Sequence, residues 1–353
     1  MAQRIFYGIL ALLVVVAVVT VDVGVARALC APTHLGVSTE LDRMLAGVLG
    51  GFADTSVGRL LARGSLIPLS FTLIVLAASI ELNRLFVAKS IRPQLPAALI
   101  TITLLLLSPW LSAAEWLGRD PAQVEGLQWQ VIWLVLGLLV SAVLLVMRRN
   151  TAGMIRDAGA TWFMMIYLGL LPSFAIQLRC DRDTPGVEGA WLVLIVLLVT
   201  KFSDIGGYLT GSLVGRHKLI PSISPGKTIE GAIGGTLASM GLAMLLAYWG
   251  DGGARTGPEG GVLALGNEIG LAFGRDMGPG TMSPLVRAAI FGLVVAVTAQ
   301  FGDLFESALK RDAGIKDSGQ IMPRFGGILD LIDSPVLTFP VAWLLLTAVW
   351  ALA

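Results

Sequence analysis

Nine long apolar runs, separated by short polar segments, restrict how this chain can fold more than any other feature. The first covers about residues 5–25, and the others begin near Leu66, Leu95, Gln130, Ala158, Gly189, Ile229, Leu285 and Pro335. A helix needs about 20 apolar residues to cross the hydrocarbon core of a bilayer. Mean hydropathy over the 353 residues is +0.80. The pattern predicts an all-α, polytopic membrane helix bundle of about nine transmembrane helices.

Charge in the short loops orients this bundle. Basic residues gather in alternate loops: Arg84, Lys89 and Arg92; Arg148, Arg149 and Arg156; Lys201, Arg216, Lys218 and Lys227; Lys310, Arg311, Lys316 and Arg324. Because lysine and arginine concentrate in cytoplasmic loops, we expect a cytoplasmic N-terminus and a multi-pass protein of the cytoplasmic membrane. For Arg148 and Arg149, setting this topology is a sufficient role. Residues 26–28 resemble a signal-peptide cleavage site, but an uncleaved first helix suits a polytopic protein better.

Composition and segmentation set further limits. The two cysteines, Cys30 and Cys180, are far apart and form no metal-binding motif, so a zinc site or a disulfide framework is not expected. No nucleic-acid-binding feature is present. We divide the chain into residues 1–190, which hold N-terminal helices with an outer loop near 30–64, and residues 191–353, which hold the chemistry-bearing segments.

Residues 301–334 form the most polar of these segments and lie between two apolar runs. Five of its acidic residues can face a common point: Asp303, Glu306, Asp317, Asp330 and Asp333. It also holds Lys310, Arg311, Lys316 and Arg324, together with the pair Gly326-Gly327. Charges beside hydrocarbon are expensive, so such a cluster indicates a functional site. An ordinary charged loop between two spans is the simpler alternative.

The spacing within this segment supports the site. In a continuing helix, Asp303, Ser307 and Lys310 share one face, and Asp330 shares a helical face with Asp333. Ser334-Pro335 is typical of the N-cap and first residue of the next helix. Carboxylate oxygens with nearby lysine and arginine suit Mg²⁺ and a polyphosphate. Adjacent glycines allow backbone N–H groups to approach a phosphate.

A second polar segment covers residues 201–230 and is also expected on the cytoplasmic side. Asp204 and Lys227 contribute opposite charges, and Thr228 can cap the following helix. Its glycines recur at helical spacing, which favours close helix contact: Gly206, Gly207, Gly211 and Gly215.

The two segments resemble the bacterial phosphatidate cytidylyltransferases (CDP-diacylglycerol synthases). That family carries the signature S-x-x-K-R-x4-K-D-x-G-x3-P-x-H-G-G-x-x-D-R-x-D, matched here by Ser307, Lys310, Arg311, Lys316, Asp317, Gly319, Pro323, Gly326, Gly327, Asp330 and Asp333. An upstream family block is matched by Asp204, Gly206, Tyr208, Gly211, Lys218, Pro221, Ser224, Pro225, Lys227, Thr228, Glu230 and Gly231. Two blocks in the correct order make a chance match improbable.

The resemblance implies transfer of a cytidylyl group from CTP to phosphatidate, giving CDP-diacylglycerol and pyrophosphate for phospholipid synthesis. It implies Asp303 and Asp330 as ligands of one or two Mg²⁺ ions, with a monovalent cation as an open alternative for the second. The resemblance further implies that Asp317 and Asp333 support these two ligands and that Asp204 orders the nucleotide. It implies that Ser307 bonds a phosphate or a metal-bound water. The residues that it implies as phosphate-binding are Lys310, Arg311, Lys316 and Lys227. A homodimer is an open alternative to a monomer.

Two positions depart from the family signature. Phe325 stands where the family usually has His, and Leu331 stands where it has Arg. Both replacements remove polar groups, and we expect Arg324 to supply charge from a neighbouring position. The open alternatives are a CTP-dependent kinase of polyprenol or another lipid alcohol, a cytidylyltransferase for a different lipid phosphate, and an inactive lipid-binding homologue.

Overall fold

The structure, a computed structural model, describes residues 14–22, 25, 64–113, 126–148, 151–180, 188–253, 282–315 and 327–349. Within these residues, eight helices are long and apolar enough to cross a membrane. They occupy the last eight of the predicted apolar runs, and residues 14–22 of the first run are also helical. The prediction of an all-α polytopic membrane protein is confirmed. The cytoplasmic N-terminus stays a prediction, and the expected outer loop near 30–64 lies almost entirely outside the described residues.

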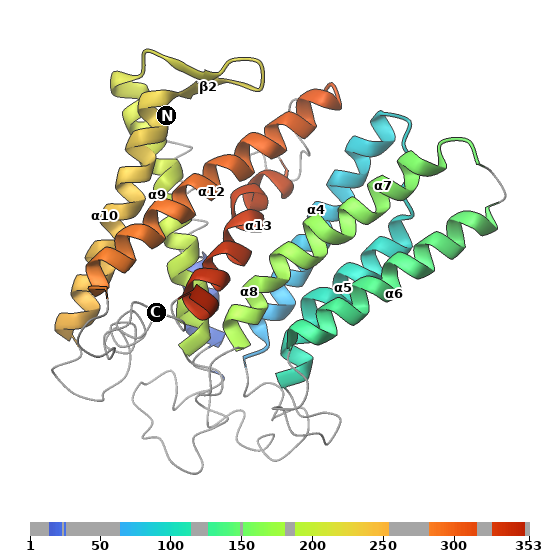
Figure 1. The fold of residues 1–353 in the computed structure, drawn as a ribbon, viewed down its shortest axis with the longest axis horizontal. Helices are drawn as coiled ribbons and strands as arrows, with labels where there is room; N and C mark the ends of the chain where they lie inside the picture. Colours follow the sequence, from blue (N-terminus) through green and yellow to red (C-terminus); the bar gives the residue numbers. More distant parts are fainter. Residues whose placement is uncertain are drawn as a thin grey trace, which may run out of the picture. The chain divides into compact units, whose positions relative to one another are not determined.

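The helices follow the chain in this order (Figure 1): α4 Leu66–Ala88, α5 Leu95–Ala113, α6 Gly126–Met147, α7 Met154–Met164, the π-helix η3 Met165–Leu170, α8 Leu171–Cys180, α9 Glu188–Val214, α10 Ile229–Gly253, α12 Pro284–Asp312, α13 Leu329–Trp343 and the π-helix η4 Leu344–Val349. The segments α7, η3 and α8 together make one candidate span, Met154–Cys180.

The chain divides into two compact units, each assembled from separate segments. Unit 1 comprises residues 1–67, 178–300 and 341–353, and unit 2 comprises residues 68–177 and 301–340. Neither unit is continuous in sequence. Our division at residue 190 concerns where the chemistry-bearing segments begin, and it stays a prediction.

In unit 1, α9 and α10 lie side by side through a seam of glycines (Figure 1). A Cβ atom at Gly235 would lie 2.5 Å from the carbonyl oxygen of Ser203, and one at Gly207 would lie 3.2 Å from the carbonyl oxygen of Gly231. Small residues allow membrane helices to pack at backbone distance, where dispersion and weak polar contacts hold them together. The predicted close helix contact is confirmed.

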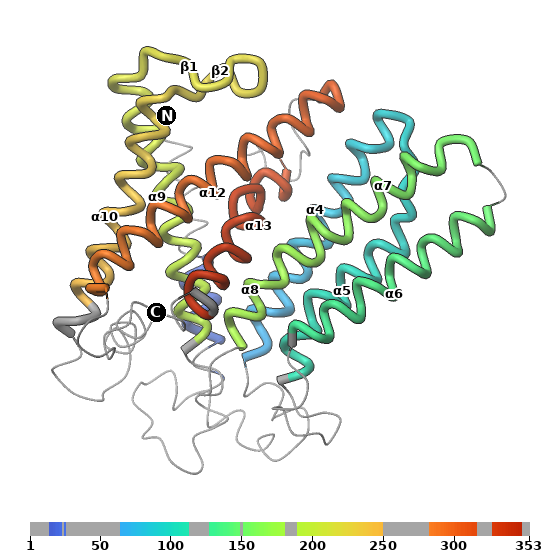
Figure 2. The backbone as a smooth tube through the Cα atoms, in the orientation of Figure 1, coloured from blue at the N-terminus to red at the C-terminus, as the bar shows by residue number. Residues whose placement is uncertain are grey.

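A short antiparallel hairpin joins these two helices (Figure 2). Strand β1 covers Lys218–Ile220 and strand β2 covers Ser224–Thr228. This hairpin was not predicted from the sequence. Thr228 then caps α10, because its Oγ1 accepts a hydrogen bond from the N–H of Gly231 at 3.1 Å. The predicted cap is confirmed.

In unit 2, α5 and α6 pack against each other, and α7 contacts both (Figure 2). An aromatic cluster joins the α7–η3 span to α12. The ring of Phe163 stacks on Tyr167 with centroids 5.1 Å apart, and the ring of Phe305 meets Tyr167 at 5.5 Å. These contacts hold the polar C-terminal part of α12 against the rest of the unit.

The start of α13 differs from the prediction. The helix begins at Leu329, so Ser334 and Pro335 lie inside it rather than at its N-cap. The backbone N–H groups at the start of α13 are bound by the carboxylates of Asp330 and Glu81, as described below. A proline inside a membrane helix is tolerated because neighbouring helices and local adjustments satisfy the freed carbonyl.

Candidate functional site

The candidate site forms where α12 and α13 approach each other in unit 2. A Cβ atom at Gly302 would lie 2.6 Å from the carbonyl oxygen of Asp333 and 3.0 Å from the Cα atom of Ser334. Only glycine permits so close an approach between two backbones. The contact brings the polar face of α12 beside the first turns of α13.

The predicted polar face of α12 is present. Asp303, Ser307 and Lys310 lie on the same helix, and the Oγ of Ser307 donates a hydrogen bond to Oδ1 of Asp303 at 3.4 Å. All three side chains are partly buried. The serine hydroxyl can therefore orient the carboxylate that we predicted as a metal ligand.

Lys310 connects the two helices through two carboxylates. Its Nζ lies 2.7 Å from Oε2 of Glu306, one turn earlier on α12, and also contacts Oδ1 of Asp330 on α13. The side chain of Glu306 is only 1% exposed. A buried charge is strongly unfavourable unless it is paired, so Lys310 compensates Glu306 while it binds Asp330.

Asp330 lies in the first turn of α13, where the helix dipole favours a negative charge. Its Oδ2 accepts a hydrogen bond from the N–H of Gly327 at 2.7 Å, and its Oδ1 contacts Lys310. A side chain that reaches back three residues to an N–H is the arrangement seen in capping boxes. Asp330 therefore both starts the helix and presents a carboxylate beside the basic group.

Glu81, from α4, fixes the same helix end and was not among the predicted site residues. It is fully buried, and its Oε2 accepts a hydrogen bond from the N–H of Leu329 at 2.9 Å. The sequence did carry a signal, because an acidic residue inside an apolar run is rare and usually functional. Glu306 was noted in the acidic cluster, but its ion pair with Lys310 was not predicted.

Of the remaining predicted residues of this segment, two lie on α12 and α13 away from the contacts of Lys310, and the others are outside the described residues. Asp333 is buried on α13, and Arg311 is exposed in the last turn of α12. The residues that the structure does not describe include Lys316, Asp317, Arg324, Phe325 and Gly326. Their roles stay predictions.

The second polar segment belongs to unit 1. Asp204 lies 3.4 Å from Nζ of Lys201, one turn earlier on α9, and Lys227 is half-buried in β2. The carboxylate of Glu230 accepts hydrogen bonds from the backbone N–H groups of Arg216 and His217 at 3.1 and 3.2 Å. This carboxylate closes the base of the hairpin and so positions the strand that carries Lys227. Participation of Asp204 and Lys227 in the α12–α13 site stays a prediction.

The donor set suits the predicted Mg²⁺. Mg²⁺ is bound in enzymes through one or two carboxylates, several waters and the substrate phosphates, rather than through a cage of protein ligands. Asp303 and Asp330 supply such oxygen donors. Among the described residues no three His, Cys, Asp or Glu side chains gather closely enough to hold an ion by themselves. A site completed by a polyphosphate fits this arrangement.

The chain is similar to several known proteins. It is 33% identical to the uncharacterized protein YnbB of Escherichia coli (strain K12) over 207 residues, which is 58% of this chain and 59% of that protein. It is 33% identical to the phosphatidate cytidylyltransferase of Mycobacterium leprae over 193 residues, covering 55% of this chain and 51% of the relative. With the phosphatidate cytidylyltransferase of Staphylococcus epidermidis, identity is 28% over 288 residues, covering 81% and 92%.

The chain thus spans between half and three fifths of the first two relatives, 51–59% of their length. A protein-family model matches a larger part of this chain than either of these two relatives does. The model described as the cytidylyltransferase family matches residues 42–349, which include both polar segments and every described helix from α4 onward. The chain therefore belongs to the cytidylyltransferase family.

Proposed function

We propose that this protein transfers the cytidylyl group of CTP to phosphatidate, producing CDP-diacylglycerol and pyrophosphate. The observation that carries the proposal is Lys310, held between Glu306 and Asp330 where α12 meets α13. This contact brings two charged residues of the family signature together, Lys310 and Asp330, with Glu306 as the second acid beside the lysine. Membership of the cytidylyltransferase family and the names of two relatives support the choice of reaction.

The reaction joins two polyanions, so its main requirement is the neutralisation and alignment of charge. An oxygen of the phosphatidate phosphate forms a bond to the α-phosphorus of CTP. The bond from that phosphorus to the oxygen leading to the β-phosphorus breaks, and pyrophosphate leaves with the electron pair. The attacking phosphate is already an anion, so no strong general base is needed.

Each named residue has a part in this scheme. Lys310 and Arg311 attract the phosphates, and Lys316 and Lys227 extend the positive surface. Ser307 orients Asp303, to which it is hydrogen-bonded. Asp303 and Asp330 would hold Mg²⁺, which would neutralise triphosphate charge and polarise the α-phosphorus. The acyl chains of the lipid stay in the bilayer while its phosphate reaches the polar end of α12. We further propose that this end faces the cytoplasm, where CTP is present.

The test uses protein purified in detergent with phosphatidate, Mg²⁺ and CTP labelled at the α-phosphorus. We expect label in the lipid phase, dependent on Mg²⁺ and lost in Asp330→Asn and Lys310→Gln. A matched control is Asp312→Asn, because Asp312 is two residues from Lys310 on α12 and its side chain is 78% exposed. This control should keep its activity.

Other outcomes redirect the proposal. Label in lipid from γ-labelled CTP with a polyprenol acceptor, and none from α-labelled CTP, would show phosphoryl transfer and refute cytidylyl transfer. Transfer to a lipid phosphate other than phosphatidate would correct the substrate alone. Well-folded protein without either activity would favour the lipid-binding homologue. Light scattering of the purified protein separately distinguishes a homodimer from a monomer.

A further inference from the structure

A basic cavity in unit 2 has no part in the proposed reaction. Its volume is about 670 Å³, and it lies among the ends of α4, α6 and α7 and the loop between α4 and α5. Of the described residues that line it, three are arginines, Arg92, Arg148 and Arg156, and one is an acid, Asp157. The lining therefore carries an excess of two positive charges, which suits an anion.

The loop that carries Arg92 is held in place by Asp157. Its Oδ1 accepts a hydrogen bond from the N–H of Arg92 at 2.9 Å, which ties the α4–α5 loop to α7. Arg148 donates from Nη1 to the carbonyl oxygen of Arg92 at 3.4 Å and lies 4.0 Å from Oδ2 of Asp157. If these arginines served only to set the membrane topology, arginines from two separate loops would have no reason to line the same cavity.

The N-terminus of α7 adds to the positive potential of the cavity. This helix begins at Met154, and the preceding Gly153 has φ of 76° and provides no side-chain cap. Both residues line the cavity. The first N–H groups of a helix carry a partial positive charge and commonly bind phosphate. The helix N-terminus is one element of a phosphate site, and the three guanidinium groups beside it are a second, independent element.

The surroundings of the cavity indicate where the phosphate comes from. The cavity lies at the ends of membrane-spanning helices, and Val87 contributes an apolar wall that is itself half exposed. Ile155, next to Met154, is 90% exposed. At the membrane boundary such apolar side chains contact acyl chains, and basic pockets between helices there bind lipid head groups.

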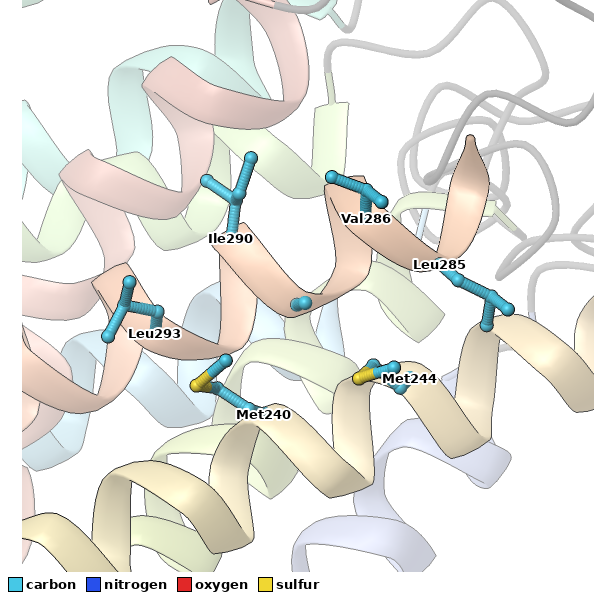
Figure 3. Close-up of a pocket in the computed structure, with 7 residues that line it drawn as sticks. Met240, Met244, Leu285, Val286, Ile290 and Leu293 are labelled. Carbon is cyan, nitrogen blue, oxygen red and sulfur yellow. The ribbon is translucent and has the colours of Figure 1, made fainter. Parts of the chain in front are cut away.

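A second cavity, in unit 1, is lined only by apolar side chains and provides a contrast. The space between α10 and α12 in unit 1 has a volume of about 180 Å³ and is lined by apolar side chains such as Met240, Met244 and Leu293 (Figure 3). It offers no polar group that could fix a head group. It therefore carries no proposal, whereas the basic cavity combines charge with an apolar wall.

We propose that the cavity lined by Arg92, Arg148 and Arg156 binds the phosphate of an anionic membrane lipid, at a site separate from the α12–α13 cluster. The two lie at the same end of unit 2, because Lys89, directly after α4, forms an ion pair of 3.1 Å with Asp312 at the end of α12. A lipid held in the cavity would therefore have its phosphate near the membrane level of Lys310.

Native mass spectrometry of the detergent-purified protein tests this without CTP. The probe is phosphatidylglycerol, an anionic lipid other than the proposed substrate, compared with zwitterionic phosphatidylcholine. We expect wild-type protein to retain phosphatidylglycerol preferentially. Each arginine near an anionic lipid contributes about a fivefold preference, so Arg92→Gln/Arg148→Gln/Arg156→Gln should weaken retention about a hundredfold. The matched control is Arg84→Gln, an exposed arginine of α4 that does not line the cavity.

Inorganic phosphate distinguishes a lipid head group from a free anion. Retention of lipid that excess phosphate does not displace supports a lipid site. Binding of phosphate in preference to lipid, lost in the triple variant, would overturn the lipid assignment. Undiminished phosphatidylglycerol on a folded triple variant would overturn the site altogether. If the triple variant does not fold, Arg156→Gln alone should still lose about fivefold, and no loss there would also refute the proposal. None of these results depends on whether CTP is a substrate.

Discussion

Removal of the Lys310 ammonium separates the structural role of this residue from its chemical role. Lys310→Met leaves the carboxylate of Glu306, 1% exposed, without the cation that lies 2.7 Å away. Breaking a buried ion pair by removing one partner destabilises a protein by about 3–5 kcal/mol. The side chain of Lys310 is 15% exposed, so we expect the lower end of this range. At about 2–4 °C per kcal/mol, the thermal midpoint should fall by roughly 10 °C.

The double variant Lys310→Met/Glu306→Gln tests the cause of that loss. It removes the buried charge, whereas Asp330 keeps its hydrogen bond from Gly327. We expect the double variant to recover at least half of the lost stability and none of the lost cytidylyl transfer. The assays are the tryptophan-fluorescence melting curve in detergent and the α-labelled CTP assay.

A surface pair of the same kind provides the control. Lys89 pairs with Asp312, but their side chains are 42% and 78% exposed. Exposed pairs contribute about 0–1 kcal/mol, so Lys89→Met should hardly change the midpoint. A Lys310→Met protein as stable as wild type, or a double variant as unstable as the single one, would refute the pairing argument.

Three further perturbations follow from the structure. Glu81→Ala removes the acceptor of the Leu329 N–H, so we expect the free energy of unfolding to fall by about 1–3 kcal/mol. Activity should fall by a larger fraction than stability, and Glu81→Gln should restore both. Gly235→Ala forces α9 and α10 apart and should destabilise by about 1–3 kcal/mol, whereas Gly241→Ala, which meets no atom within 4 Å, should stabilise the helix by about 0.5–1 kcal/mol. Asp22→Ala removes the carboxylate that lies 3.0 Å from the buried guanidinium of Arg179; it should cost about 3–5 kcal/mol, much of which Asp22→Leu/Arg179→Leu recovers. Thermal melting measures all three, and equal midpoints within any pair would contradict the corresponding contact.

Much of this protein follows from short-range pattern. Apolar runs near the length of a bilayer crossing predicted each span that is described, because hydrocarbon accepts only segments whose backbone is bonded internally. Helical spacing predicted that Asp303, Ser307 and Lys310 share a face, and a threonine before an apolar run predicted the cap at Thr228. The resemblance of two blocks to a family predicted the family that the comparisons show.

Tertiary structure decided where α13 begins and what holds its first turn. From local signals, Ser334-Pro335 was the better helix start, since proline loses no hydrogen bond at that position. Contacts across the unit override this preference: Glu81, 248 residues earlier in the chain, binds the N–H of Leu329, and Asp330 meets Lys310 of α12. A carboxylate near a helix N-terminus stabilises it wherever the carboxylate comes from in the sequence. Local pattern therefore determined which segments are helices and which faces are polar, whereas packing determined which charges meet.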